Sequence, residues 1–388
     1  MDLPKRIANS LRNRGIKGTL NRINRRVGIV SSRGKPTGRI CLRPFYYAVI
    51  DAAGSVYCCC SVWVKFRLGK LRKGKSLKDI WNSRVAQVFR DAMLKTELDR
   101  VCHCEICPYI ISRRLPKHIN GKTEFDLDSR AVFDREILRD EDVLRAISNG
   151  DRVLDYYPKQ LEIGVDRTCN LCCSSCRQKH ITQVSPKERD LLDLCMSVLR
   201  EARRDIKILS LLSSGEVFYS KFCLELLQSL DRTEYPHMKV DILTNGQLIN
   251  DETWRKIGPG ADFIKSVSIS IDAAKKETYE ILRGGGRWER LLDNMEFVKN
   301  LREHGKLDEF SINFVISEKN FREMPDFVML GERYNVDFVV FSRIEPWASM
   351  QIDYREAAVH LGSHNMHREF EEILKDPIFK SEHVVLGA

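Results

Sequence analysis

The chain has 388 residues, of which 43% are hydrophobic and 30% are charged, and these values are ordinary for a globular protein with a sizeable core. No apolar run approaches the roughly 18 residues that a membrane span needs, and the N-terminus lacks the apolar middle of a secretory signal. We therefore expect a cytoplasmic, reducing location, where thirteen cysteines are better explained by metal binding than by disulfides.

The first 39 residues form a basic leader. They contain eleven Lys and Arg against one Asp, which accounts for the whole net charge of +10 and leaves the remainder of the chain neutral. A solvated leader is the simplest interpretation, but an amphipathic helix within residues 4–27 could lie on an anionic surface. An arm that binds nucleic acid is a third interpretation, although the segment lacks interleaved aromatic residues.

Residues 40–115 predict a small cysteine-rich domain. Seven cysteines fall in this stretch, together with a hairpin-like turn at Asp51–Gly54 and a helical pattern over Leu77–Leu94. Residues 116–158 are rich in charged side chains and predict a helical connector.

Residues 159–345 predict an α/β domain, because strand and helix patterns alternate along them. The first helix begins with a capping box, Ser185 to Glu188, with proline at its first position. Six strand–helix units in sequence imply a parallel sheet, which curls into a partial (β/α)6 TIM-like barrel. The expected strands are Leu161–Val165, Ile206–Leu212, Val240–Leu243, Ser266–Ile271, Phe310–Ile316 and Phe338–Phe341. Residues 346–388 form a C-terminal extension.

A cysteine triplet follows the first strand of this domain. Cys169, Cys173 and Cys176 are spaced C-x3-C-x2-C, at the carboxyl end of a strand, where parallel sheets present their ligands. Three thiolates bind three irons of a 4Fe–4S cluster and leave the fourth iron open to an external ligand. A structural zinc site would need four protein ligands, and Cys172 could supply the fourth, but its neighbour Cys173 makes that arrangement strained.

Further motifs follow the triplet in order, and each stands at or near the end of a later strand. They are Ser213-Ser214-Gly215-Glu216, Thr244-Asn245-Gly246, Ser268-Ile269-Ser270-Ile271-Asp272, Arg283 and Asn313. With the triplet, this set resembles the radical S-adenosylmethionine (SAM) superfamily over about residues 159–345. The resemblance implies that SAM is contacted by Ser214, Gly215, Glu216, Ser268, Ser270, Asp272, Arg283 and Asn313. Ser175, Ser213 and Val217 depart from the family's usual residues.

The resemblance also implies an activity. A reduced 4Fe–4S cluster would cleave SAM to a 5′-deoxyadenosyl radical, which would take hydrogen from a peptide, protein or carbohydrate-type substrate. A low-potential electron donor such as flavodoxin or ferredoxin would then be a partner. The alternative is a catalytically inert binding protein on the same fold, stapled by zinc or an iron–sulfur cluster.

The N-terminal cysteines resemble a SPASM or twitch module, which is an auxiliary iron–sulfur domain. The order of Cys41, the glycine turn, the Cys58–Cys60 run and the pair Cys104 and Cys107 carries this resemblance. It implies a second cluster whose ligands are Cys41, Cys59, Cys104 and Cys107. Cys58, Cys60 and Cys102 are alternative ligands, and a zinc knuckle with the same four thiolates is an alternative centre.

Overall fold

The computed structural model describes residues 34–125, 133, 136–211, 214–346 and 350–387. Contacts group the chain into two compact units. Unit 1 comprises Met1–Tyr46, Tyr57–Gly69 and Lys78–Tyr156, and unit 2 comprises Tyr47–Val56, Lys70–Leu77 and Tyr157–Ala388. Most of the basic leader lies outside the described residues. Within them, no helix has the length and apolar character to cross a membrane.

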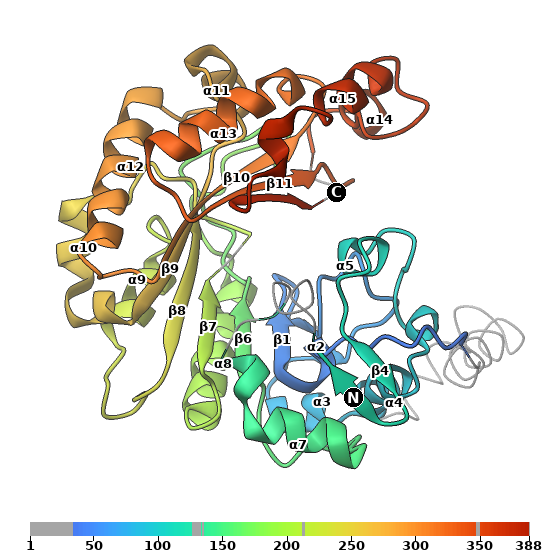
Figure 1. Cartoon of the computed structure of the whole chain (residues 1–388). Coiled ribbons are helices and arrows are strands. Elements are labelled where there is room, and N and C mark those ends of the chain that lie inside the picture. Colours follow the sequence, from blue (N-terminus) through green and yellow to red (C-terminus); the bar gives the residue numbers. More distant parts are fainter. Residues whose placement is uncertain (1–33, 126–132, 134–135, 212–213, 347–349, 388) are drawn as a thin grey trace, which may run out of the picture. The chain divides into compact units, whose positions relative to one another are not determined.

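Unit 2 is built on a parallel sheet whose strands follow one another in chain order (Figure 1). The six expected strands are all present, and each pairs in parallel with the next, so the prediction of a partial (β/α)6 barrel is confirmed. They are β6 (Gln160–Ile163), β7 (Ile208–Leu211), β8 (Lys239–Thr244), β9 (Ile264–Ser270), β10 (Glu309–Ile316) and β11 (Phe338–Arg343).

Two further strands extend this sheet beyond the expected six. β12 (Val384–Gly387) comes from the C-terminal extension and pairs in parallel with β11. β1 (Tyr47–Ile50) pairs in parallel with β6, although its residues belong to the stretch 40–115 that the sequence assigned to the cysteine-rich domain. The division of the chain by contacts therefore differs from the boundaries expected from the sequence.

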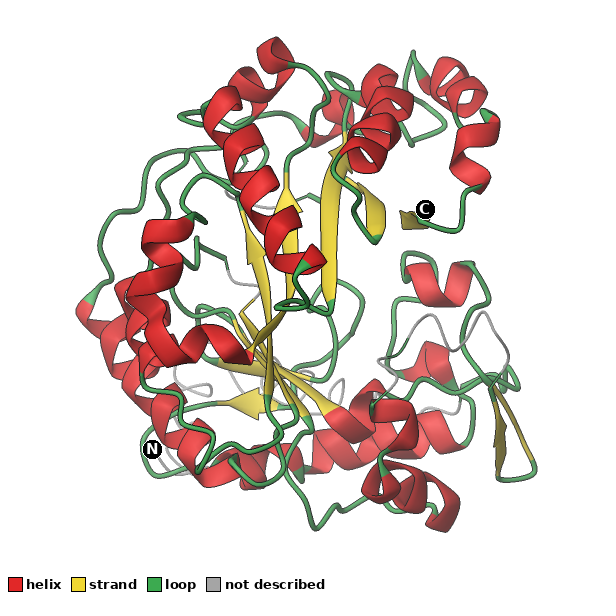
Figure 2. Cartoon of the chain, turned by 60° about the vertical axis from the view of Figure 1, so that its left-hand side comes forward, coloured by secondary structure: helices red, strands yellow, loops and turns green. Residues whose placement is uncertain are grey.

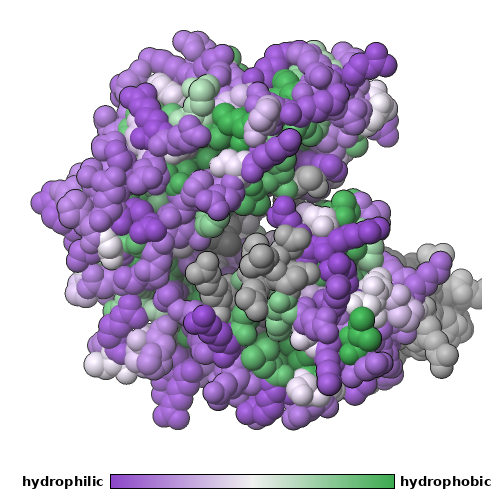
Figure 3. Space-filling model, viewed as in Figure 1, coloured by the Kyte–Doolittle hydropathy of each residue, from purple (hydrophilic) through white to green (hydrophobic). Residues whose placement is uncertain are grey.

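Helices connect the strands and pack along the sheet (Figure 2). The helix after β6 carries the expected capping box, in which Ser185 Oγ accepts a bond from Glu188 N and the Glu188 carboxylate accepts one from Ser185 N at 2.8 Å. The surface around α10 and α12 is hydrophilic in the view of Figure 3. The helices of unit 2 are α8 (Pro186–Ala202), α9 (Lys221–Gln228), α10 (Asp251–Ile257), α11 (Lys276–Leu282), α12 (Trp288–Glu303), α13 (Met324–Arg333), α14 (Tyr354–Ala357) and α15 (His367–Ile373).

The two faces of the sheet differ in polarity, as β9 shows. Val267 and Ile269 are fully buried, whereas Ser266, Ser268 and Ser270 on the alternate positions are only half-buried. Because successive side chains of a strand point to opposite faces, the serines share the face that the apolar residues leave. This polar face carries the motif residues of β9 toward the carboxyl end of the sheet.

Unit 1 is mostly helical, and a buried arginine lies at its centre. Arg90 is fully buried and donates to the carbonyl oxygens of Pro44, Trp81 and Arg152 at 2.7–2.9 Å, while it stacks 4.5 Å from the Trp81 ring. Burial lowers the pKa of Arg90 to about 10. The helices are α2 (Arg43–Tyr46), α3 (Leu77–Trp81), α4 (Arg84–Leu94), α5 (Pro108–Ile111) and α7 (Glu141–Asn149), and the short strands are β2 (Ser55–Tyr57), β3 (Gly69–Lys70), β4 (Lys117–Ile119) and β5 (Lys122–Glu124).

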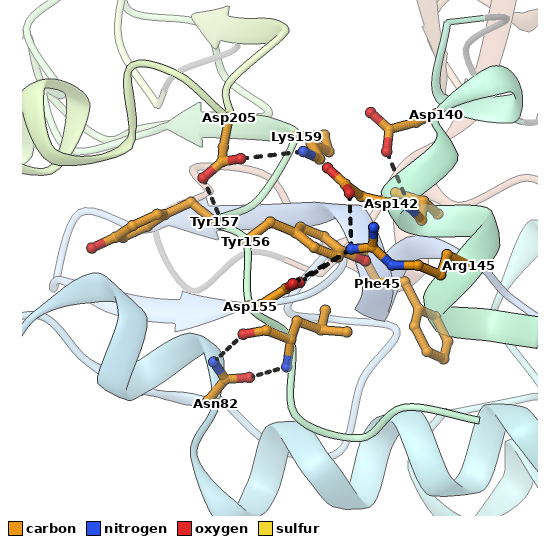
Figure 4. Close-up of polar contacts among 12 residues, drawn as sticks. Phe45, Asn82, Asp140, Asp142, Arg145, Asp155, Tyr156, Tyr157, Lys159 and Asp205 are labelled. Carbon is orange, nitrogen blue, oxygen red and sulfur yellow. Dashed lines mark hydrogen bonds and ion pairs between the residues drawn. The ribbon is translucent and has the colours of Figure 1, made fainter. Parts of the chain in front are cut away.

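Side chains fix the last residues of the segment predicted as a connector (Figure 4). In unit 1, Asn82 accepts a bond from Leu154 N and donates one to Leu154 O, both at 2.8 Å, and the Tyr156 hydroxyl donates to Phe45 O at 3.0 Å. Within unit 2, the Asp205 carboxylate accepts bonds from Tyr157 N at 3.1 Å and from Lys159 Nζ at 3.2 Å. The ends of both units at the 156/157 boundary are therefore held by hydrogen bonds.

Candidate functional site

The cysteine loop begins directly after β6, and a buried carboxylate fixes its start. One oxygen of Asp166 accepts bonds from Thr168 N and Thr168 Oγ1, both at 2.8 Å, and the other accepts one from Ser220 Oγ at 2.6 Å. Ser220 in turn caps the N-terminus of α9. A single side chain thus ties the loop to the helix that follows β7.

Cys169, the first cysteine of the triplet, is buried among amide donors. Its sulfur accepts bonds from Leu171 N at 3.4 Å and from Asn245 Nδ2 at 3.8 Å. Burial raises the pKa of the Cys169 thiol to about 11. A metal ion that binds this sulfur must displace its proton, and donors already point at the sulfur that would carry the negative charge.

The other two cysteines of the triplet each meet an arginine. Arg283 Nη1 lies 3.9 Å from the buried sulfur of Cys173, and Arg177 Nη2 lies 3.6 Å from the exposed sulfur of Cys176. Burial raises the pKa of Cys173, while the charge of Arg283 acts in the opposite direction. Two guanidinium groups are therefore placed to compensate negative charge on this loop.

Cys172 has a different set of partners from the triplet. Its sulfur lies 3.8 Å from Arg177 O and 3.6 Å from Gln351 Nε2, in the C-terminal extension. Gln351 also donates to Arg177 O at 2.6 Å and, through its backbone N–H, to Ser174 O at 2.9 Å. These contacts keep Cys172 on the side of the loop that Gln351 covers.

The segment after β7 docks on the backbone of the cysteine loop. Glu216 N donates to Thr168 O at 2.8 Å, and Ser214 O accepts a bond from Arg177 at 2.6 Å. A Cβ on Gly215 would lie only 2.5 Å from Thr168 O and 2.7 Å from Asp166 O, so only glycine fits this close approach. The predicted motif and the triplet are thus in direct contact.

The predicted residue Glu216 is buried, and both of its carboxylate oxygens are used inside the protein. Thr244 Oγ1 donates to one oxygen at 2.6 Å and Asn245 N donates to the other at 2.7 Å. Burial raises the pKa of Glu216, and these hydrogen bonds oppose the shift. In this structure Glu216 positions the end of β8, and with it the side chain of Asn245.

Asp272 and Arg283, both predicted site residues, form a buried ion pair. Their charged atoms lie 2.7 Å apart, and the side chains are only 7% and 12% exposed. Asp272 has a φ of 66° and accepts a bond from Val315 N at 2.8 Å. Burial works against the charge of Arg283, but Asp272 and Cys173 outweigh it and raise the pKa of the guanidinium. The arginine is therefore held between a carboxylate and a cysteine of the triplet.

The serines of β9 face the fifth strand of the barrel. Ser268 Oγ lies 2.5 Å from Ser311 Oγ, so this predicted residue already has a partner. Ser270 stands opposite Asn313 in the β9–β10 register, and Asn313 Nδ2 is a buried donor without a hydrogen-bond partner among the described residues. Because an unpaired buried donor costs about 1–3 kcal/mol, it points to a ligand that accepts from this atom.

Three residues of the site were missed by the sequence reasoning. Arg177 follows the last cysteine directly, and Asn245 belongs to a motif that was assigned only to the end of a strand. Gln247 donates to Tyr279 Oη at 2.9 Å and to Arg287 O at 3.0 Å, and accepts from Arg287 N at 3.0 Å. Proximity to the triplet in the chain could have singled out Arg177, but no sequence signal marks Gln247.

The N-terminal cysteines gather around one pocket in unit 1. Five of the residues that line it are Cys41, Cys58, Cys59, Cys102 and Cys107. Three of the four predicted ligands are thus brought together, but Cys104 is not among the lining residues. In the part of the chain that the structure describes, no three His, Cys, Asp or Glu side chains converge as ligands of one metal ion.

Comparison with protein families gives two matches. Residues 164–329 match the radical SAM superfamily, and residues 41–108 match an iron–sulfur cluster-binding domain. The first range contains the triplet and the later motifs. The second begins at Cys41 and ends one residue after Cys107, so both matches agree with the resemblances that the motifs carry.

Individual relatives are distant. A probable GTP 3′,8-cyclase of Saccharolobus islandicus is 23% identical over 228 residues, which are 58% of this chain and 67% of that protein. The mycofactocin maturase MftC of Mycolicibacterium smegmatis is 27% identical over 53% of this chain and 49% of its own length. Among solved structures, Streptococcus suis SuiB bound to precursor peptide SuiA is similar with a TM-score of 0.46 and 17% identity, over 78% of this chain and 62% of SuiB. The chain thus spans about half to two thirds of these proteins.

Proposed function

Because the chain belongs to the radical SAM superfamily and carries an iron–sulfur cluster-binding domain over residues 41–108, we propose that it is an enzyme that cleaves SAM reductively and takes hydrogen from a substrate. The observation that carries the proposal is the triplet at the carboxyl end of β6. Two of its sulfurs are buried and the third is exposed, and the three meet amide and guanidinium donors from later strands and loops.

The donors of the loop suit a 4Fe–4S cluster. Cys169, Cys173 and Cys176 would each bind one iron, and a fourth iron would remain for an external ligand. Nearby Arg177 and Arg283 would compensate the negative charge of a thiolate-bound cluster. When bound, the cluster supplies the one electron that breaks the C5′–sulfonium bond of SAM, which yields methionine and the 5′-deoxyadenosyl radical that takes a hydrogen atom from the substrate.

The residues around the triplet suit SAM as the external ligand. Asn313 Nδ2 is a buried donor that needs an acceptor, and Ser270 stands beside it with its side chain on the polar face of the sheet. Gly215 leaves its backbone close to the loop, so main-chain groups of this segment are available where a side chain would not fit. The proposed SAM-contacting residues remain Ser214, Gly215, Glu216, Ser268, Ser270, Asp272, Arg283 and Asn313.

Two of these residues would act through others. Glu216 holds Thr244 and the backbone of Asn245, so it would orient the amide that donates to Cys169. Asp272 holds Arg283, so it would orient the guanidinium beside Cys173. We therefore assign Glu216 and Asp272 positioning roles, and we assign direct contact with the cofactor to Asn313 and Ser270.

The substrate class of the proposal is a peptide, a protein or a carbohydrate-type metabolite. The relatives are named as a nucleotide cyclase, a mycofactocin maturase and a heme synthase, so their names span several substrate classes. An auxiliary cluster in residues 41–108 supports the peptide alternative by resemblance, since such modules accompany many peptide-modifying members of the superfamily. A low-potential donor such as flavodoxin or ferredoxin would supply the electron.

The test is anaerobic reconstitution with iron and sulfide, followed by SAM and dithionite. The reconstituted protein is expected to release 5′-deoxyadenosine and methionine, and Cys173→Ala is expected to abolish the release while unit 1 keeps its iron. A protein that binds about four irons at the triplet but releases no 5′-deoxyadenosine would overturn the proposal and favour the inert binding protein. Replacing dithionite by reduced flavodoxin or ferredoxin tests the physiological donor in the same assay.

A further inference from the structure

An apolar pocket in unit 1 holds more thiols than one cluster needs. Five cysteines line it, together with aromatic and aliphatic side chains that include Trp63, Phe89 and Tyr109. Trp63 and Tyr109 meet edge to face, with ring centroids 5.7 Å apart. A 4Fe–4S cluster takes at most four thiolates, so the structure must be asked which of the cysteines are its ligands.

A short antiparallel pairing brings Cys102 into the pocket. Cys102 forms an isolated bridge with Val64, and the pairing is extended by bonds from Lys65 N to Val101 O and from His103 N to Trp63 O, both at 2.9 Å. Residues directly opposite each other in such a pair place their side chains on the same face. Val64 and Cys102 accordingly both line the pocket.

A tight turn takes Cys104 away from the same pocket. The backbone N–H groups of Ile106 and Cys107 both donate to His103 O, at 3.2 and 3.1 Å, so the chain reverses between His103 and Cys107. Cys107 returns to the pocket, whereas the sulfur of Cys104 lies 3.9 Å from the backbone oxygen of Cys102. The C-x2-C pair therefore does not act as a pair.

Electrostatic neighbours separate the two thiols further. Cys102 interacts with the four other cysteines of the pocket, and burial raises the pKa of its thiol. The charged neighbours of Cys104 are instead Asp99, Lys65 and Glu105. Cys104 thus lies in a polar, charged setting outside the group of thiols.

Cys58 is the remaining lining cysteine. It interacts with Cys59 and Cys41, and also with the guanidinium of Arg90, which is locked by three carbonyl oxygens. Cys102, in contrast, interacts with all the other thiols of the pocket, including Cys107. Cys102 therefore occupies the more central position, and Cys58 lies toward Arg90.

We propose that the auxiliary iron–sulfur cluster takes Cys102, and not Cys104, as its fourth ligand. The ligand set is then Cys41, Cys59, Cys102 and Cys107. The proposal rests on the iron–sulfur cluster-binding domain of residues 41–108 and does not depend on the cleavage of SAM. Four thiolates saturate the four irons, so this cluster has no open iron for a substrate and serves as an electron relay or a structural staple.

The first test counts iron and sulfide in a chain whose triplet cysteines are replaced by alanine, so that only unit 1 binds iron. This background is expected to hold about four irons and four sulfides per chain after anaerobic reconstitution. Adding Cys102→Ala is expected to lower iron below about one per chain, whereas the matched variant Cys104→Ala keeps the full amount. Full iron in Cys102→Ala overturns the proposal, and so does one zinc per chain without sulfide.

A second test uses the unsubstituted sequence, so that a failure of Cys102→Ala to fold cannot decide the result. The loaded full-length protein is alkylated with iodoacetamide under anaerobic conditions, and modified cysteines are located by mass spectrometry. Cys104 is expected to react at least about tenfold faster than Cys102, and removal of iron by a chelator is expected to expose Cys102. Protection of Cys104 with rapid modification of Cys102 would overturn the assignment. Because neither test uses SAM, a failure here is distinct from a failure of the proposed function.

Discussion

The two cysteine regions of the chain differ in what surrounds their sulfurs. In the loop after β6, the sulfurs meet backbone N–H groups, an asparagine amide and two guanidinium groups. In the pocket of unit 1, the sulfurs meet one another among apolar side chains, and burial raises the pKa of Cys41 to about 12 and that of Cys107 to about 11. The first setting suits a centre that exchanges a polar ligand, and the second suits a closed centre.

The two regions also differ in how their cysteines are positioned. The loop of unit 2 is held by side chains that belong to later strands, so residues far away in the sequence control its geometry. In unit 1, a turn and a short strand pairing decide which cysteines reach the pocket. We therefore expect that substitutions outside the cysteines can disable the first region while leaving the iron of the second intact.

The largest effect is expected from Gly215→Ala. The added Cβ would meet backbone oxygens of Thr168 and Asp166 at 2.5 and 2.7 Å, and backbone atoms cannot move aside as a flexible side chain can. The cysteine loop must shift, so we expect a loss of about four irons per chain and of 5′-deoxyadenosine release, with the unit 1 cluster retained. The matched control is Gly362→Ala, whose Cβ would have no neighbour closer than 4.0 Å. Full iron in Gly215→Ala would show that the loop does not depend on this approach.

A smaller effect, on stability, is expected from Asp272→Asn. Asparagine tolerates the positive φ of this position and can still accept from Val315 N, but it leaves the buried charge of Arg283 without its partner. Breaking one side of a buried ion pair costs about 3–5 kcal/mol. The unfolding free energy of the iron-free protein, measured by urea denaturation, should fall by about this amount.

The control for Asp272→Asn is Glu252→Gln, which removes an exposed i,i+4 pair with Lys256 on α10. Water already screens that pair, so the midpoint of denaturation should stay the same within error. Equal effects of the two substitutions would mean that the Asp272–Arg283 pair contributes no more than a surface contact, and the positioning role of Asp272 would be lost with it.

A still smaller effect is expected from Gln351→Ala. Gln351 bonds Arg177 O and contacts the sulfur of Cys172, so its loss removes about one hydrogen bond from the outer side of the cysteine loop. One such bond is worth about 1 kcal/mol, which corresponds to roughly fivefold faster alkylation of Cys172 by iodoacetamide. Gln228→Ala serves as the control, since Gln228 bonds Lys256 O at a distance from the loop in the sequence. Unchanged alkylation in Gln351→Ala would exclude a covering role.

Much of unit 2 could be predicted because its signals are local. The alternation of apolar strands with capped helices marks each strand–helix unit, and the capping box at Ser185 and Glu188 was found as expected. The spacing of Cys169, Cys173 and Cys176 falls within eight residues, so no tertiary contact is needed to recognise it. Parallel order then follows from the right-handed crossovers.

The remainder depends on contacts between distant residues. β1 and β12 join the sheet through edge pairing, which no periodicity reports. The difference between Cys102 and Cys104 depends on one turn at His103, and both cysteines look equivalent as letters in a C-x-C sequence. Asn313 was predicted from a resemblance, but its unpaired buried amide became visible only through the packing of β10.

The smallest expected effect concerns two buried histidines, one in each unit. Burial lowers the pKa of His118 in unit 1, where Nδ1 bonds Thr123 Oγ1 at 2.9 Å. Burial, with the charges of Arg343, His367 and His364, lowers the pKa of His360 in unit 2 to about 4. The other group that faces His360 is the Tyr354 hydroxyl, 3.3 Å from Nε2.

Both histidines should therefore make the protein less stable in mild acid, and His360 more so. The unfolded chain takes up the proton near pH 6.5, whereas folded His360 does so only near pH 4, so its contribution to stability is complete above pH 6.5 and declines as the pH falls toward 4. His360→Gln should reduce the difference in Tm between pH 7 and pH 5 more than His118→Gln does, and the exposed His304→Gln should leave the difference unchanged. Equal pH dependence in the His360→Gln and His304→Gln variants would contradict the neutral, buried state of His360, and would remove this distinction between the units.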